Sequence, residues 1–153
     1  MPREPSRFDS PSTVDRLFNR LFGVLVGLGI GLPHNYQLRV RGRRSGRLYA
    51  TPVDVLSHAG RRYLVAPRGE AQWVRNARAS GRVALKRGAR LEEFRLRPVT
   101  DAEKPDLLKA YLDRFRLTVQ RYFPVRAGSP VEAFAPHVAR YPVFELLPDA
   151  AAR

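Results

Sequence analysis

A short basic segment between glycines offers the first set of side chains that could do chemistry. Residues 41–47 read RGRRSGR, which places guanidinium groups and a hydroxyl beside two glycines. Glycine lets backbone N–H groups approach an anion closely, and arginine forms charge-assisted bonds with phosphate or carboxylate. A solvated basic turn without a ligand is the alternative. The candidate anion-binding residues are Arg43, Arg44, Ser45 and Arg47.

A second candidate site lies where a strand ends and a helix begins. Residues 66–76 read APRGEAQWVRN, so a glycine loop precedes a helix whose first N–H groups are available to an anion. Trp73 is the only tryptophan of the chain and could flank a planar ring, and Arg75 could pair with phosphate. Core packing of Trp73 and Val74 is the alternative.

Tyrosine hydroxyls are the candidates for proton donation to a reduced substrate. They belong to Tyr111, Tyr122 and Tyr141. Tyr111 and Tyr122 also fit the apolar face of a helix, so core packing is the alternative for both. We expect no metal site, because the chain has no cysteine and its three histidines are far apart in the sequence.

The net charge indicates an anionic ligand. Lys and Arg number 28 against 14 Asp and Glu, which gives +14 at pH 7. Such a charge attracts nucleic acid, anionic lipid or phosphorylated small molecules. Proteins that bind single-stranded nucleic acid often interleave aromatic with basic residues, whereas here the aromatic residues fall mostly on apolar faces. We therefore expect a small-molecule ligand and no nucleic acid.

The elements that position these residues follow from hydrophobic periodicity. Residues 1–12 are expected to form a mobile tail, followed by a helix that begins near Thr13 and ends near Leu28. The apolar run 21–32 has twelve residues, shorter than the roughly 20 of a membrane span. We therefore expect a cytoplasmic protein whose first helix is available for peripheral contact with a membrane surface.

The rest of the chain predicts one α+β domain over residues 13–149. Tight hairpins join most of the strands, which indicates an antiparallel or mixed sheet closed into a small barrel. Helices flank it, the last opened by a capping box at 129–132. The expected strands are 36–41, 48–56, 63–66, 83–86, 91–99 and 141–147, and the expected helices are 71–79, 101–123 and 130–134.

The two candidate segments, in register, resemble the deazaflavin-dependent nitroreductase and quinone reductase family. The basic turn is followed in the family's order by Thr51-Pro52, by the segment 60–65 and by Trp73-Val74-Arg75-Asn76. The resemblance covers residues 36–97 well and the later elements more loosely. It implies a split β-barrel that binds coenzyme F-420, an 8-hydroxy-5-deazaflavin with a phosphodiester and a polyglutamate tail. It also implies hydride transfer to a small quinone, enone or nitro compound.

The resemblance also implies roles for particular residues. The basic turn would grip the phosphate and tail through Arg43, Arg44, Ser45 and Arg47. The second segment would lie along the deazaflavin ring through Ala66, Arg68, Gly69, Trp73 and Val74. The chain departs from the family at Tyr49, where many members have a basic residue, and at Pro67, where some nitro-reducing members have serine.

Two other classes of function remain open from the sequence. An oxidoreductase that binds flavin mononucleotide on a similar barrel would also need arginines, although a single phosphate hardly needs so many. A non-catalytic module that binds a cofactor or a lipid is the second alternative. Both a monomer and a homodimer are compatible with the sequence.

Overall fold

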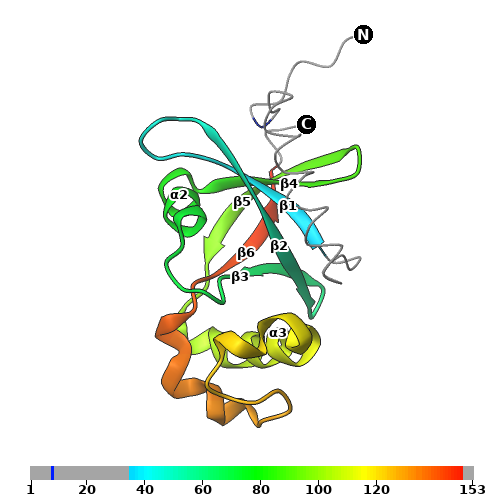
Figure 1. Ribbon diagram of the computed structural model, residues 1–153, viewed down its shortest axis with the longest axis vertical. Coiled ribbons are helices and arrows are strands. Elements are labelled where there is room, and N and C mark those ends of the chain that lie inside the picture. Colours follow the sequence, from blue (N-terminus) through cyan, green and yellow to red (C-terminus); the bar gives the residue numbers. More distant parts are fainter. Residues whose placement is uncertain (1–7, 9–34, 150–153) are drawn as a thin grey trace.

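The computed structural model describes Phe8 and residues 35–149, and it shows a closed β-barrel with helices packed outside it (Figure 1). This architecture confirms the expected α+β barrel with flanking helices. Apart from Phe8, the expected tail over residues 1–12 lies outside the described residues, and so does the whole of the expected first helix.

The strands of the described chain follow one another round the barrel in the order β1-β2-β3-β6-β5-β4. Every neighbouring pair is antiparallel, so the mixed alternative is not realised. The last strand enters between β3 and β5 and closes the barrel. The strands are β1 (Asn35–Arg41), β2 (Leu48–His58), β3 (Arg61–Val65), β4 (Arg82–Arg87), β5 (Arg90–Pro98) and β6 (Val143–Pro148).

The barrel interior is filled by alternate residues of the strands, as the pleat requires. Leu38 and Val40 of β1 are fully buried, and so is Leu64 of β3. Each contributes to one apolar cluster, which holds the sheet closed. The cluster also contains Val55, Val83, Leu85, Phe94 and Leu146 of the other strands and Ala77 of the first described helix.

The helix α2 (Gln72–Ser80) lies beside the projecting β1–β2 hairpin (Figure 1). Val74 and Ala77 are buried on its inner face. It ends at Gly81, whose left-handed backbone (φ 69°) lets its N–H donate to the carbonyl of Ala77 at 2.7 Å. The helix expected over residues 71–79 is therefore confirmed to within one residue at each end.

A second group of helices packs on the outer side of β2, β3 and β6. The group consists of η1 (Asp101–Glu103), α3 (Lys104–Val119), η2 (Gln120–Tyr122) and the 3₁₀-helix η3 (Val131–Arg140). The apolar face of α3, with Leu108, Leu112 and Phe115, is buried against the strands and η3. None of the described helices is both long enough and apolar enough to cross a membrane.

The predicted capping box at 129–132 is wrong. Pro130, not Ser129, occupies the N-cap of η3, and no side chain caps that helix. The carbonyl of Ser129 instead accepts a hydrogen bond from Lys109 Nζ at 2.8 Å. A capping box does form at η1, where Thr100 N–H and Oγ1 both donate to Glu103 Oε2, at 2.9 and 2.8 Å.

Candidate active site

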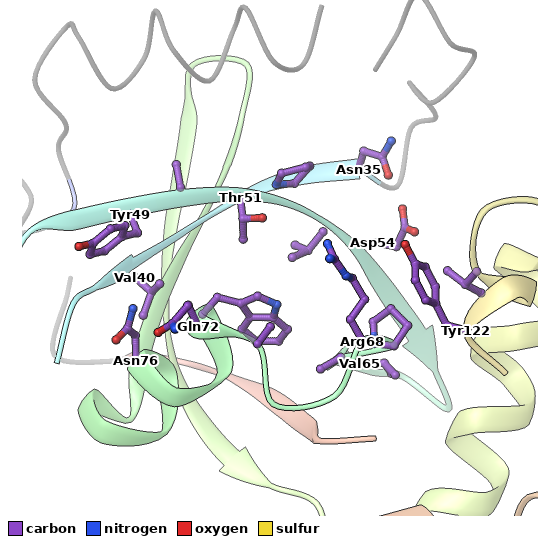
Figure 2. Close-up of a pocket in the computed structure, with 18 of the residues that line it drawn as sticks. Asn35, Val40, Tyr49, Thr51, Asp54, Val65, Arg68, Gln72, Asn76 and Tyr122 are labelled. Carbon is purple, nitrogen blue, oxygen red and sulfur yellow. The ribbon is translucent and has the colours of Figure 1, made fainter. Parts of the chain in front are cut away.

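A cavity of about 790 Å³ runs beneath β2, from the β1–β2 hairpin and α2 at one end to α3 and η2 at the other (Figure 2). Its size falls in the usual range for small-molecule sites. The pleat of β2 places Pro52 and Asp54 on the same face as Leu56, which packs in the cluster beneath α3. One long strand therefore links the basic hairpin to the tyrosines of the helical group.

Arg43 is tied to α2 at the hairpin end of the cavity. Its backbone N–H donates to Asn76 Oδ1 at 3.1 Å, and its Nη1 donates to the same oxygen at 2.8 Å. The same Nη1 also donates to Gln72 Oε1 at 3.1 Å. Within the turn, Gly42 N–H donates to the carbonyl of Arg47 at 2.7 Å. The basic turn is thus fixed to the helix by neutral amides, and no described acidic residue pairs with Arg43.

Two other arginines add positive charge to the cavity. Arg44 and Arg68 both line it and are exposed, and neither guanidinium has a hydrogen bond or ion pair with a residue that the structure describes. Figure 2 shows Arg68 extending across the cavity from the loop below β2. By contrast, Arg78 on the outer side of α2 is paired with Glu70 at 2.7 Å. Arg44 and Arg68 are therefore available to an anionic ligand.

The middle of the cavity has an apolar wall. Trp73 is half-buried, and it packs against both the barrel cluster and Phe144, with ring centroids 6.3 Å apart at 60°. Val65 and Ala66, at the end of β3, line the cavity beside it. A flat apolar wall of this kind suits a planar ring system. Trp73 therefore packs in the core and also lines the cavity, while its contact with a planar ring stays a prediction.

The opposite end carries an acid and two phenols. Burial raises the pKa of the Asp54 carboxyl from 3.8 to about 6. Burial also raises the pKa of Tyr111, and the neighbouring Asp54 and Tyr122 raise it further. The Tyr122 hydroxyl points toward Asp54 (Figure 2), and the Arg121 guanidinium lies 4.8 Å from the centre of the Tyr122 ring. This end can therefore hold and move a proton.

The structure brings most of the sequence-predicted site residues to this one cavity. Those that line it are Arg43, Arg44, Ser45, Ala66, Arg68, Trp73, Tyr111 and Tyr122. Four others do not line it: Arg47, Gly69, Val74 and Arg75. Val74 is fully buried on the inner face of α2, and Gly69 shapes the preceding loop with a φ of 79°. The third tyrosine, Tyr141, is also buried away from the cavity.

Sequence reasoning missed several lining residues. They are Tyr49, Asp54, Gln72, Asn76 and Arg121, among others. One signal was available for Asp54, an acid within the apolar run Val53-Asp54-Val55-Leu56 of a strand. Nothing local marks Gln72 or Asn76, because polar residues are ordinary on a surface helix.

A family model for F-420H(2)-dependent quinone reductases matches residues 14–124, nearly three quarters of the chain. The chain belongs to this family, whose members are oxidoreductases that use coenzyme F-420. Every described residue that lines the cavity lies inside the matched span, whereas η3 and β6 lie outside it. No curated protein matches the sequence at a significant level.

Solved structures support the fold. An Agrobacterium tumefaciens protein of unknown function matches with a TM-score of 0.57 and 16% identity over 76% of this chain; the match spans about half (49%) of that longer protein. An F-420-H2-dependent reductase, FDR-A, matches with a TM-score of 0.50 and 16% identity, over 74% of this chain and 94% of its own. A chain described as a domain-swapped dimer matches with a TM-score of 0.51 and 15% identity, over 90% of this chain and 99% of its own.

The residues of the cavity fit the cofactor of the family. Coenzyme F-420 joins a planar deazaflavin to a phosphodiester and an acidic tail, so its site needs an apolar slot next to a basic end. The wall around Trp73 would supply the slot, and Arg44 at the hairpin end, which has no ion pair with a described residue, would supply a charge-assisted donor.

Proposed function

We propose that this chain transfers hydride from reduced coenzyme F-420 to a small quinone. Enones and nitro compounds accept hydride by related two-electron chemistry and are the other substrate classes we consider. The serine that some nitro-reducing members of the family carry is replaced here by Pro67, which lines the cavity and has no side-chain donor. That replacement favours a quinone over a nitro compound.

One observation carries the proposal: a single cavity joins arginines that have no ion pair among the described residues to an acid and a tyrosine. Arg44 and Arg68 offer positive charge, and Asp54 and Tyr122 offer a proton. A module that only bound a cofactor would need the first pair and not the second. A hydride-transfer enzyme needs both, because the reduced substrate must also take up a proton.

The chain's own residues have three tasks in this reaction. The turn that Asn76 holds, with Arg44 and Ser45, binds the phosphate and acidic tail. Trp73 and Ala66 orient the planar ring and exclude water from one side of it. The bound cofactor supplies the hydride. At the far end, the substrate oxygen lies within reach of a proton from the tyrosine end of the cavity.

A pair of binding titrations tests the cofactor assignment. The purified protein is titrated with coenzyme F-420 and with flavin mononucleotide under matched conditions, at low and at high salt. We expect tighter binding of F-420, and an affinity that falls with salt because exposed ion pairs are screened over about 10 Å at 0.1 M ionic strength. Tighter binding of flavin mononucleotide would show that the deazaflavin assignment is wrong.

A turnover assay tests the reaction. Reduced F-420 is mixed with a soluble naphthoquinone, an enone or a nitroaromatic compound, and cofactor oxidation is followed by absorbance. We expect the quinone to give the highest kcat/KM. If F-420 binds but none of the three compounds is reduced, the chain is a cofactor-binding module.

A further inference from the structure

Asp54 and Tyr122 come from distant parts of the chain, and both lie at the tyrosine end of the cavity. Asp54 lies on β2, two residues before Leu56, which packs in the cluster beneath α3. Tyr122 is the last residue of η2, and its hydroxyl points toward the Asp54 carboxyl (Figure 2). Both side chains line the cavity, so a substrate bound there lies next to the pair.

Tyr141 holds the backbone of Tyr122 in place. The hydroxyl of Tyr141 donates a hydrogen bond to the backbone carbonyl of Tyr122 at 2.7 Å. The ring of Tyr141 stacks on that of Phe123, with centroids 4.4 Å apart and planes 13° from parallel. On the other side, the Arg121 guanidinium lies over the Tyr122 ring. Tyr122 is thus contacted at its backbone and its ring, while its hydroxyl faces the cavity.

We propose that Asp54 is the proton reservoir of the reaction and that Tyr122 passes its proton to the reduced substrate. The inference rests on the proposed function, and it assigns a role to a residue that sequence reasoning did not find. In this scheme Tyr122 is the catalytic residue, because it touches the substrate, and Asp54 is a positioning residue that acts through it.

A quinone receives one hydride, with its two electrons, on one carbonyl oxygen, from the C–H bond that breaks in reduced F-420. Both C=O π bonds are lost as the ring becomes aromatic, and the second oxygen becomes a phenolate. That oxygen takes the proton of Tyr122, so that the product is a hydroquinone with two O–H bonds. Tyr122 recovers a proton from Asp54, and Asp54 recovers one from solvent at the open side of the cavity. The reductant is reduced F-420 alone.

The chemistry of the two groups agrees with this order. With its pKa raised to about 6, Asp54 keeps a proton far closer to neutral pH than an exposed carboxyl does. Tyr111 is 2% exposed and its pKa is raised, so it is the poorer proton donor of the two phenols. Among the described residues, the charged groups that face this end are Arg121 of η2 and Arg68 of the β3–α2 loop; the neutral Asn35 is opposite Asp54 in register on β1.

The rate of quinone reduction should depend on the protonation of Asp54. Only a protonated Asp54 can return a proton to Tyr122, so the protonated carboxyl is the active form. We expect the wild-type kcat for quinone reduction to fall above about pH 6, by about tenfold per pH unit where the proton transfer limits the rate. Asp54→Asn should lower kcat at pH 6 by about a hundredfold and should have a flat profile above that pH.

Four variants test the proposal with reduced F-420 and a soluble naphthoquinone. Asp54→Asn keeps the shape of the side chain, Asp54→Glu restores the acid, and Tyr122→Phe removes only the hydroxyl. Asp106→Asn changes an exposed acid of α3 away from the cavity and serves as the matched control. We expect partial rescue of both rate and pH profile by Asp54→Glu, and wild-type behaviour of Asp106→Asn. F-420 affinity should stay within about twofold of wild type in all four variants, since the proposed function assigns the cofactor's anionic groups to the hairpin end of the cavity.

A second readout does not depend on turnover. Carbon-detected NMR of the free protein reports the titration of the Asp54 carboxyl directly, and we expect a midpoint near pH 6. A midpoint near 4 would overturn the proposal, and so would an unchanged kcat–pH profile in Asp54→Asn. Failure of F-420 to bind would instead count against the proposed function. If F-420 binds and the quinone is reduced while Asp54→Asn behaves as wild type, only the relay is refuted.

Discussion

The side-chain oxygen of Asn76 accepts two hydrogen bonds from Arg43, one from its backbone N–H and one from its guanidinium group. Asn76 is buried on α2, 5% exposed, whereas Arg43 is exposed at the tip of the β1–β2 hairpin. The contact spans 33 residues of sequence. It turns a hairpin tip, which by itself would be free to move, into one wall of the cavity.

Removal of the Asn76 amide should therefore affect both stability and binding. Asn76→Ala leaves the Arg43 N–H without its acceptor, and we expect a loss of about 1–3 kcal/mol in the free energy of unfolding. F-420 affinity should fall as well, because the turn loses its anchor. Denaturant unfolding and a cofactor titration measure the two effects. Arg78→Ala on the outer side of α2 is the control, since its exposed ion pair with Glu70 contributes little.

A double-mutant cycle sharpens this test. If Arg43 acts through Asn76, the two single alanine variants and the double variant should not be additive in unfolding free energy. Additive losses would mean that the two residues stabilise the protein independently, and the anchoring role of Asn76 would then be wrong.

Arg44 should act on binding alone. Its guanidinium is exposed and without a partner among the described residues, so Arg44→Ala should leave the thermal midpoint of the free protein unchanged. F-420 binding should weaken by about 1.5–3 kcal/mol, the usual value for a hydrogen bond between charged groups. Arg47→Ala is the matched control from the same turn, because Arg47 does not line the cavity. Equal losses in both variants would indicate a diffuse charge effect and not a contact at Arg44.

Trp73 gives an optical test of the apolar wall. As the only tryptophan, its fluorescence should be quenched when F-420 binds. Trp73→Phe should retain most of the packing against Phe144 and lower stability only modestly, while F-420 affinity or the rate of hydride transfer falls. An unchanged fluorescence at saturating F-420 would remove Trp73 from the site.

Much of the fold could be predicted because its determinants are local. The alternation of Leu38 and Val40 with polar neighbours marks a strand in any context, and Gly81 marks a helix end by its backbone freedom. The capping box failed for a local reason as well. The Ser-x-x-Glu pattern cannot tell which residue becomes the N-cap, and Pro130 took that place one residue later.

The site was only half predictable, because its polar contacts join distant parts of the chain. The basic turn and Trp73 are conspicuous in the sequence itself. Asn76 can contact Arg43 only when α2 lies beside the hairpin, and Asp54 can lie next to Tyr122 only when β2 passes under η2. The pKa of Asp54 is likewise a property of the assembled cavity, since burial by groups remote in sequence causes its shift.

Asp54 should make the protein less stable than it could be at neutral pH. Because its pKa is raised from 3.8 to about 6 in the folded state, folding binds a proton between these values, and the stability contribution of Asp54 is lost as pH rises through about 6. Above that pH the buried charge lowers the free energy of unfolding by at most about 3 kcal/mol, at 1.36 kcal/mol per pKa unit. Asp54→Asn removes this charge while it retains the shape of the side chain.

We therefore expect Asp54→Asn to raise the thermal midpoint at pH 8 and to leave it nearly unchanged at pH 4, where the wild-type carboxyl is also neutral. Asp106→Asn should show no such difference, because Asp106 is exposed. Calorimetry of the free protein at both pH values measures the effect without cofactor or substrate. A variant that is less stable than wild type at pH 8 would mean that the Asp54 carboxylate makes a net stabilising contact. A gain in stability accompanied by loss of quinone reduction would instead show that Asp54 lowers the stability of the folded protein and is needed for the reaction.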